Sequence, residues 1–307
     1  MKPIRIGTRG SALALAQAGW VRGKLEERHP GLQITTVVIK TSGDRFLETP
    51  LQAIGGKGLF VKEIEEALLR GEIDLAVHSM KDLPTENPAG LVFAAIPERE
   101  DPRDALVSSG RRALKDLPSG ARIGTGSLRR RAQILYHRPD LVVEPIRGNI
   151  DTRLKKLERG ELEALVMAGA GLKRIGCESR ISEYLSPQIC LSAVAQGALA
   201  LETREGDPVI EQVSFLHYPP TATQILAERA FLKRLGGGCQ VPVGARAWTD
   251  DEQIRLLGVV CEHNGCRLYK GEIAGSIADA ERLGRGLAER LLEDGADAVL
   301  CQARMPQ

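Results

Sequence analysis

The sequence predicts an α/β protein in which two similar lobes are followed by a small C-terminal α+β domain with an antiparallel sheet. Short apolar runs of strand length alternate with helical stripes, which is the pattern of α/β folds. Two short motifs recur in the same order, which indicates that the same unit occurs twice. A hairpin signal between two helical patterns predicts the antiparallel sheet near the end of the chain.

The composition limits the possible partners. The 307 residues include 42 Lys and Arg against 40 Asp and Glu, a formal net charge of +2. Such a balance excludes attraction of the whole surface to nucleic acid or membranes. No apolar run approaches the ~20 residues of a membrane span, and the N-terminus lacks the features of a secretory signal. Six cysteines are too sparse for a disulfide scaffold, so we expect reduced thiols in a cytoplasmic protein.

The first lobe begins with an expected strand at Ile4–Thr8 and a helix at Ala12–Arg28. Ser11 is the expected N-cap of this helix. Because free N–H groups at a helix N-terminus attract anions, Arg9 marks either an anion site or a capped helix with a surface arginine. The apolar face of the helix is expected to contain Leu13, Ala16, Trp20 and Val21.

A second strand, Leu32–Ile39, leads into a glycine-rich segment at 41–58 without clear periodicity. A loop of this length is usually functional or disordered, and Lys57 near its end makes it a candidate lid over an anionic ligand. Further strands are expected at Ile73–Val77 and Leu91–Ile96. Between them and the loop lies a helical stripe of Phe60, Ile64, Ala67 and Leu68.

The stretch His78–Pro84 directly follows the expected strand at Ile73–Val77. Ligands of open α/β sheets bind at the carboxyl ends of strands. The histidine, Lys81 and Asp82 are therefore candidates for a functional site, and a solvated polar loop is the alternative.

Two echoes predict the second lobe. The tetrapeptide Arg-Ile-Gly-Thr at 5–8 recurs at 122–125, and Leu69–Val77 is echoed by Glu158–Val166. The offset is 117 from residue 5 to residue 122, and 89 from residue 70 to residue 159. The first copy therefore contains extra chain between the two points, where the glycine-rich segment lies.

In the second copy, Ser127 is positioned to start a helix that contains the arginines 129–131. Each helical step rotates by ~100°, so these arginines cannot share one face and two are expected to point inward. Strands are expected at Leu141–Ile146 and Leu162–Met167, and several arginines fall where strands end and helices begin. A solvated basic face and a nucleic-acid patch are the alternatives, although aromatic residues make up only 4% of the chain.

After the second lobe, the chain is expected to return to the first lobe through residues 191–202, and a helix at Pro208–His217 would complete that lobe. Pro219 and Pro220 predict a boundary. In the last domain we expect helices at Thr221–Leu235 and Ser276–Asp294, a loop at Gly236–Gly244 and hairpin strands at Ile254–Glu262 and Cys266–Ile273.

Cys239 follows three glycines, which allow close approach of another group. Its thiol is a candidate nucleophile or covalent attachment point, and a buried inert cysteine is the alternative. Zinc ligation by Cys261, His263 and Cys266 is a further alternative. Their spacing matches no common structural zinc pattern, and we assign no metal.

Six motifs, in one order along nearly the whole chain, are together highly specific. They are Ile6–Ser11, Gly55–Phe60, His78–Pro84, Gly124–Arg130, Arg147–Arg153 and Leu235–Cys239. By these motifs the sequence resembles the hydroxymethylbilane synthases, also called porphobilinogen deaminases. The region beyond Gly244 matches the family weakly.

The resemblance implies three domains, of which the first two look like the lobes of type II periplasmic binding proteins with a cleft between them. The implied boundaries are 1–98 with 197–217, then 99–196, then 218–307. In the family, the cysteine at position 239 holds one dipyrromethane cofactor per chain through a thioether. Four porphobilinogen molecules are joined to it head to tail, each losing ammonia, and water releases hydroxymethylbilane.

The resemblance also implies roles for residues. Porphobilinogen carries an acetate and a propionate, and guanidinium forks match such carboxylates. The cofactor-binding residues would be Lys81, Asp82, Thr125, Ser127, Arg129 and Arg130, with Cys239 as the covalent attachment. The substrate-binding residues would be Arg9, Ser11, Lys57, Arg147, Arg153 and Arg174.

Asp82 is the candidate catalytic residue. A carboxylate beside pyrrole N–H groups stabilises the positive charge left when ammonia departs, and at ~4 Å the Coulomb energy reaches ~4 kcal/mol as an upper guide. The same carboxylate could help to move protons between the steps. The surrounding cations favour its ionised form.

Two other functions stay open at this point. A non-catalytic solute-binding protein for a polycarboxylate would have the same lobes, but the missing export signal and the cysteine-bearing domain argue against it. A thiol-dependent acyltransferase needs a base near Cys239, and the sequence does not place His78 or His217 there. The family expectation is a cytoplasmic monomer that binds porphobilinogen and neither nucleic acid nor membrane.

Overall fold

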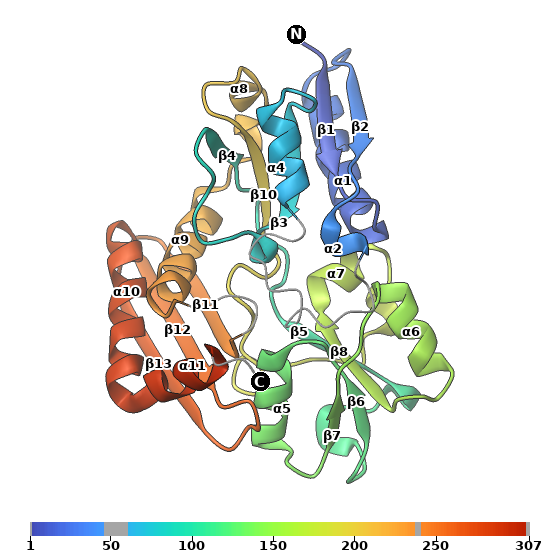
Figure 1. The fold of residues 1–307 in the computed structure, drawn as a ribbon, viewed down its shortest axis with the longest axis vertical. Helices are drawn as coiled ribbons and strands as arrows, with labels where there is room; N and C mark the ends of the chain where they lie inside the picture. The colour runs from blue at the N-terminus through green and yellow to red at the C-terminus, as the bar shows by residue number, and fades with distance from the viewer. Residues whose placement is uncertain (1, 46–60, 237–240, 305–307) are drawn as a thin grey trace. The chain divides into compact units, whose positions relative to one another are not determined.

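A computed structural model describes residues 2–45, 61–236 and 241–304 (Figure 1). Lys57 and Cys239, together with most of the expected lid segment, lie outside these residues. The chain divides into two compact units, one comprising residues 1–100 and 198–222 and the other comprising 101–197 and 223–307. Within the described residues, no helix is long and apolar enough to cross a membrane.

The first unit contains a five-stranded sheet with the order β2-β1-β3-β10-β4. Strand β1 is parallel to β2 and β3, whereas β10 is antiparallel to β3 and β4. The chain thus returns to the first sheet after residue 197, as the sequence predicts. The strands are β1 (Ile4–Thr8), β2 (Ile34–Val38), β3 (Leu75–Ser79), β4 (Leu91–Ala95) and β10 (Leu199–Arg204).

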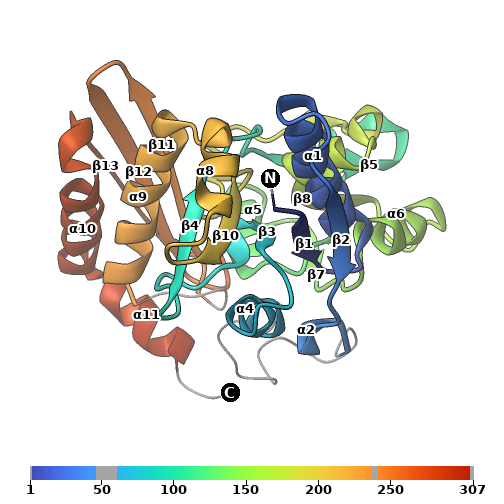
Figure 2. The ribbon, with the colours of Figure 1, turned by 90° about the horizontal axis from the view of Figure 1, so that it is seen from above.

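Helices cover both faces of this sheet. Helix α1 (Ala12–Arg28) and helix α4 (Lys62–Leu69) lie on opposite faces, as Figure 2 shows. Each packs on its own cluster of buried apolar residues, so the sheet is covered on both sides as expected for parallel strands. The shorter elements are α2 (Ser42–Arg45), η1 (Met80–Asp82), α8 (Val209–Val213) and η5 (Ser214–Leu216).

The predicted buried face of α1 is partly wrong. Val21 is buried as expected, but Trp20 is 44% exposed. The face that packs on the sheet consists of aliphatic side chains and one amide. These residues are Ala14, Gln17, Ala18, Val21 and Leu25.

The second unit contains a sheet with the order β7-β6-β8-β5-β9. Its strands are β5 (Asp104–Ser108), β6 (Arg122–Gly124), β7 (Val142–Glu144), β8 (Ala164–Ala168) and β9 (Glu183–Tyr184). Its helices and turns are α5 (Leu128–His137), α6 (Ile150–Glu158), α7 (Gly169–Arg174), η2 (Ser109–Arg111), η3 (Leu114–Asp116) and η4 (Glu178–Arg180). Three parallel strands followed by an antiparallel fourth strand repeat the plan of the first sheet.

The internal repeat is confirmed at the level of individual hydrogen bonds. The N–H of Asp74 donates to the carbonyl of Arg5, and the N–H of Glu163 donates to the carbonyl of Arg122. The carboxylates of Asp74 and Glu163 accept in turn from the N–H groups of Arg5 and Arg122, at 3.0 and 2.6 Å. The two sheets therefore share one register, with the same offsets of 117 and 89 that the sequence echoes have.

The second unit also contains an antiparallel sheet, β11 (Val243–Asp250), β12 (Gln253–Cys261) and β13 (Leu268–Ser276), which confirms the predicted hairpin. Helix α10 (Ala280–Leu291) packs on it, followed by the π-turn η7 (Leu292–Ala296) and α11 (Asp297–Arg304) (Figure 1). The short η6 (Ile277–Asp279) precedes α10.

The boundary predicted at Pro219 and Pro220 lies close to residue 222, where the first unit ends. Both prolines begin α9 (Pro219–Arg234), where the missing N–H groups cost no helical hydrogen bond. From the same helix, the buried carboxylate of Glu228 accepts hydrogen bonds from the backbone N–H of Ala195 at 2.7 Å and of Ala247 at 2.8 Å. One side chain thus joins α9, the segment that precedes β10, and strand β11.

Candidate functional site

In the first unit, four residues expected at the site gather at one edge of the sheet. Strands β1 and β3 are parallel neighbours, so their carboxyl ends lie side by side. The end of β1 leads to Arg9 and Ser11, and the end of β3 leads through η1 to Lys81 and Asp82. This is the edge at which open α/β sheets bind ligands.

The helix cap at this edge is confirmed. The Ser11 hydroxyl accepts a hydrogen bond from the N–H of Ala14 at 3.3 Å, which satisfies one free donor of α1. Asp82 is exposed at the end of η1, and Lys81 is half-buried beside it. A solvent-facing carboxylate next to a lysine and a helix N-terminus can meet both the cationic and the anionic parts of a ligand.

His78 does not lie in a loop past the strand, as the sequence suggested. Strand β3 continues to Ser79, so His78 is a strand residue and is only 5% exposed. Its Nε2 lies 3.0 Å from Oε2 of Glu202, which is 1% exposed. His78 therefore supports the site edge from within the sheet.

The second unit has a corresponding edge at the carboxyl ends of β6 and β8. The Oγ1 of Thr125 accepts from the N–H of Ser127 at 3.3 Å, and the Oγ of Ser127 accepts from the N–H of Arg130 at 3.4 Å. Ser127 is thus the N-cap of α5, as predicted. Gly126 between them must be glycine because a Cβ atom would lie 2.8 Å from the carbonyl oxygen of Ile146.

Three arginines near this edge form a cluster of like charge. Arg153 donates through Nε to the carbonyl of Gly148 at 2.8 Å, and the positive φ of Gly148, 101°, turns the chain there. Burial and the nearby charges of Arg130 and Arg147 lower the pKa of Arg153 to about 10. Within the described part of the chain, neither Arg147 nor Arg153 has a carboxylate partner, so this cluster is suited to an anionic ligand.

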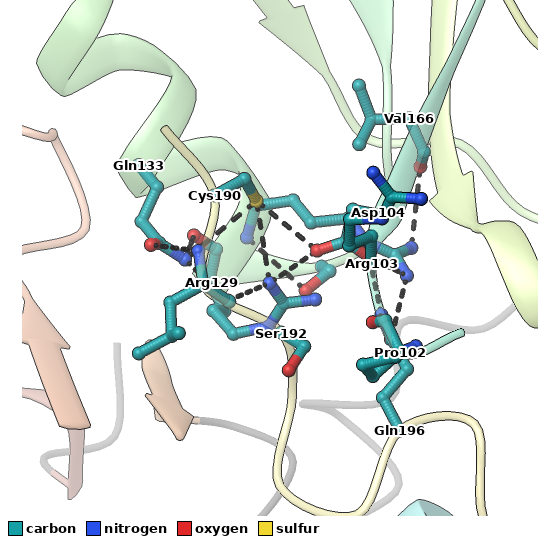
Figure 3. Close-up of polar contacts among 12 residues, drawn as sticks. Pro102, Arg103, Asp104, Arg129, Gln133, Val166, Cys190, Ser192 and Gln196 are labelled. Atoms are coloured by element: carbon teal, nitrogen blue, oxygen red, sulfur yellow. Dashed lines mark hydrogen bonds and ion pairs between the residues drawn. The ribbon is translucent and has the colours of Figure 1, made fainter. Parts of the chain in front are cut away.

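Arg129 and Arg130 point inward and Arg131 is exposed, which confirms that two of the three arginines are buried. Their partner is Asp104, a fully buried carboxylate at the start of β5 (Figure 3). Nη1 of Arg129 lies 2.6 Å from Oδ2 of Asp104, and Nε of Arg130 lies 2.9 Å from Oδ1. Burial opposes ionisation of Asp104, but the two guanidinium groups hold its pKa well below the usual range.

The remaining contacts of this network also come from within the second unit. Arg129 donates to the carbonyl of Leu191 at 2.5 Å, and Gln196 donates to Oδ1 of Asp104 at 2.8 Å. The Sγ of Cys190 lies 3.2 Å from Oδ2 of Asp104. Sequence reasoning missed Asp104, although an acidic residue at the start of an apolar strand in an arginine-rich lobe was a usable signal.

Arg174 ends α7, and its Nη2 donates to the carbonyl of Gly197 at 2.7 Å. Lys57 and Cys239 lie outside the described residues, so their predicted roles rest on the sequence. Burial raises the pKa of the Cys190 thiol and raises that of Cys261 to about 12, so neither is an activated nucleophile. The described residues contain no group of three or more His, Cys, Asp or Glu that could hold a metal ion.

Among solved structures, the chain is similar to a Bacillus subtilis protein described as a methionine-binding lipoprotein, with a TM-score of 0.44 and 14% identity over 72% of this chain and 92% of that one. It is also similar to an arginine-specific periplasmic binding protein of Salmonella typhimurium, with a TM-score of 0.41 and 15% identity over 72% and 94%. Likeness at this level carries no inference about a ligand.

Sequence comparisons are far closer. Residues 4–212 match the family model of the porphobilinogen deaminase dipyrromethane cofactor binding domain, and residues 222–293 match that of the porphobilinogen deaminase C-terminal domain. The porphobilinogen deaminase of Syntrophotalea carbinolica is 54% identical over 97% of this chain and 95% of its own length. That of Geobacter metallireducens is 53% identical over 98% and 95%.

These matches cover both units and both sheet edges described above. The chain therefore belongs to the porphobilinogen deaminase family, the dipyrromethane-dependent transferases that join porphobilinogen molecules into hydroxymethylbilane.

Proposed function

We propose that Asp82 is the catalytic carboxylate of this porphobilinogen deaminase. The observation that carries the proposal is its place, exposed at the carboxyl end of β3 beside Lys81 and the capped N-terminus of α1. From there its oxygens can accept hydrogen bonds from pyrrole N–H groups. They can also stabilise the positive charge that develops on the substrate as ammonia leaves.

We propose that Cys239 holds the dipyrromethane, which supplies the pyrrole to which the substrates are joined. The residues of the second unit fit such a group because it carries several carboxylates. Arg147 and Arg153 present like charges without a carboxylate partner among the described residues, and Arg153 is partly desolvated. The N-capped start of α5, with Thr125 and Ser127, adds further hydrogen-bond donors.

The cationic side chains are proposed to bind the carboxylates of the cofactor and of the substrate chain. Lys81, Arg129 and Arg130 bind the cofactor, and both arginines also hold Asp104. The substrate chain is bound by Arg9, Ser11, Lys57, Arg147, Arg153 and Arg174. Guanidinium groups suit this role because they remain charged and can form paired hydrogen bonds with a carboxylate.

We also propose the three-domain division of 1–98 with 197–217, 99–196 and 218–307, which the three separate sheets support. The protein is proposed to act as a cytoplasmic monomer without nucleic-acid or membrane partners. The balanced charge and the five described cysteines, all free thiols, support this. Light scattering of the purified protein measures the oligomeric state, and a dimeric mass contradicts the proposed monomer.

The Asp82 proposal is tested with Asp82→Asn, which keeps the size and exposure of the side chain. We expect an unchanged melting temperature and a turnover number lower by roughly 10²-fold or more, since a carboxylate that stabilises developing charge is worth about that much. Release of ammonia from porphobilinogen gives the rate. Turnover near that of the unsubstituted enzyme removes Asp82 from the catalytic role.

A further inference from the structure

A second group of ionisable side chains lies in the first unit, on the face of its sheet that α4 covers. His78 of β3 and Glu202 of β10 are 5% and 1% exposed, with Nε2 3.0 Å from Oε2. Glu65 of α4 is half-buried and interacts electrostatically with both. All three lie between the sheet and α4, on the side where Ala76 joins the apolar cluster of that helix. We call His78, Glu202 and Glu65 the buried triad.

The buried triad is poorly satisfied. Four of its polar atoms are buried without a hydrogen bond among the described residues. They are Nε2 of His78, both carboxylate oxygens of Glu202 and Oε1 of Glu65. The 3.0 Å approach of His78 to Glu202 is close enough for an ion pair but is out of line for a hydrogen bond. Each unsatisfied buried polar group costs free energy, so the arrangement is not explained by stability.

The second lobe has the same fold without the buried triad, so the residues at its matching positions can be compared. The register of 89 places Met167 at the position of His78, and Leu154 at the position of Glu65. Strand β5 pairs with β8 as β10 pairs with β3, which places Val107 at the position of Glu202. All three counterparts are buried and belong to a single apolar cluster.

The architecture therefore accepts three apolar residues at these positions, and only the lobe that contains Asp82 has ionisable ones. Replacing a buried ionic group with apolar residues of similar volume is often neutral or stabilising. A costly triad kept in one lobe alone indicates a task in that lobe. Asp82 lies four positions after His78, and no regular structure other than η1 follows β3 before Asp82.

We propose that His78, Glu202 and Glu65 are positioning residues that hold the end of β3, and with it Asp82, in the orientation required for turnover. The N–H of Met80 donates to the carbonyl of Ala198 at 3.0 Å, so β10 guides β3 up to the first residue of η1. The His78 imidazole and the Glu202 carboxylate connect the same two strands, β3 and β10, before Met80. Glu65 connects both side chains with α4. The orientation of η1 thus depends on the balance of charge within the buried triad.

The charge balance of the buried triad follows from its neighbours. Burial and the charge of Glu202 raise the pKa of Glu65, which favours its protonated form and leaves one carboxylate for one imidazole. The strand neighbours on β1 and β4 are Gly7 and Phe93, neither of them ionisable. Arg204, on the same face of β10 as Glu202, is paired with Asp74 and Asp207. A substitution that removes one of these charges therefore changes the charge balance between the sheet and α4.

This inference rests on the role proposed for Asp82, and its test includes Asp82→Asn in parallel. The variant that removes the triad copies the second lobe: His78→Met, Glu202→Val and Glu65→Leu together. The full-length protein is measured for melting temperature, for covalent mass, and for kcat and KM with porphobilinogen from pH 6 to 9. Met167→Leu, at the matching position of the second lobe, is the control.

We expect the triple variant to melt no lower than the unsubstituted enzyme and to carry the same covalent mass. Its kcat should fall by roughly tenfold or more while KM changes by less than about threefold, because the groups that touch substrate are intact. Glu65→Gln mimics the protonated carboxyl and should keep kcat within about twofold near neutral pH. Glu202→Gln leaves the imidazole without its partner, so it should lower kcat and change the pH profile.

The single variants decide the question if the triple variant does not fold. A kcat that Glu202→Gln leaves unchanged across the pH range overturns the inference, and so does a triple variant with unaltered kcat. If Asp82→Asn loses turnover in the same experiment while the triad variants do not, only the positioning role fails. If Asp82→Asn retains turnover, the proposed role of Asp82 fails as well.

Discussion

Nη1 of Arg129 lies 2.6 Å from Oδ2 of Asp104, and both side chains are buried, at 4% and 0% exposure. Arg130 binds the other oxygen of the same carboxylate, so two buried guanidinium groups share one negative charge. This makes Asp104 the electrostatic centre of the second lobe.

Asp104→Asn should therefore destabilise the protein severely. Removing one partner of a buried ion pair leaves uncompensated charge and typically costs about 3–5 kcal/mol. Urea unfolding followed by circular dichroism measures the loss. Asp140→Asn, which breaks an exposed pair with Arg138, is the matched control and should change stability far less. Equal effects of the two substitutions contradict the central role of Asp104.

Arg153→Gln should separate binding from stability. The side chain is half-buried beside Arg130 and Arg147, and their repulsion contributes to the lowered pKa of Arg153. Neutralising it should leave the folded state as stable as before or more stable, by up to about 1 kcal/mol. The KM for porphobilinogen should rise by roughly tenfold, since a charge-assisted hydrogen bond to a carboxylate is worth about 1.5–3 kcal/mol. Unchanged KM argues against substrate binding by Arg153.

Acid should weaken the first unit through Asp74. Burial of this carboxyl raises its pKa, but hydrogen bonds from Arg5 and the charges of Arg5 and Lys2 bring it to about 2. Because the folded pKa is lower than the unfolded one, the stabilisation is complete above about pH 4. It is lost as the pH falls toward 2, by about 1–2 kcal/mol after allowance for solvent screening. Urea unfolding at several pH values measures it, and Asp74→Asn should flatten this part of the profile.

Cys239→Ser should abolish covalent attachment of the dipyrromethane. We expect denatured, freshly prepared enzyme to be heavier than its sequence mass by one dipyrromethane, and the variant to lack that mass and turnover. Intact-mass spectrometry gives the answer directly. Cys266→Ser, which alters an exposed thiol, is the control and should keep the full mass. Active enzyme with an unmodified mass is incompatible with the proposed attachment.

Much of the fold was predictable because strands and capped helices are determined locally. Ile4–Thr8, the Ser11 and Ser127 caps and the β12–β13 hairpin follow from patterns a few residues long. The two echoes predicted the paired lobes because the same turn, helix end and strand start require the same residue types. The burial of Trp20 was misjudged, since burial depends on neighbours that the sequence does not identify.

The site was only partly predictable for the same reason. The positions of Lys81 and Asp82 follow from the rule about strand ends, and two inward arginines follow from helical geometry. The carboxylates of Asp104 and Glu202 lie far in sequence from their partners. Glu202 meets His78 through the pairing of β10 with β3, and Asp104 of β5 meets Arg129 and Arg130 of α5. Short patterns contain no information on such distant pairings, so both carboxylates went unnoticed.

Glu228 has a consequence for how the protein unfolds. Its carboxylate accepts hydrogen bonds from the N–H groups of Ala195 and Ala247. Ala195 lies in the segment before β10, and Ala247 lies in strand β11 of the C-terminal sheet. Unfolding of either part alone would leave the buried Glu228 carboxylate without one of its hydrogen-bond donors. The two parts should therefore unfold cooperatively. Three sheets should therefore give at most two calorimetric transitions, and the C-terminal sheet should have no melting temperature of its own.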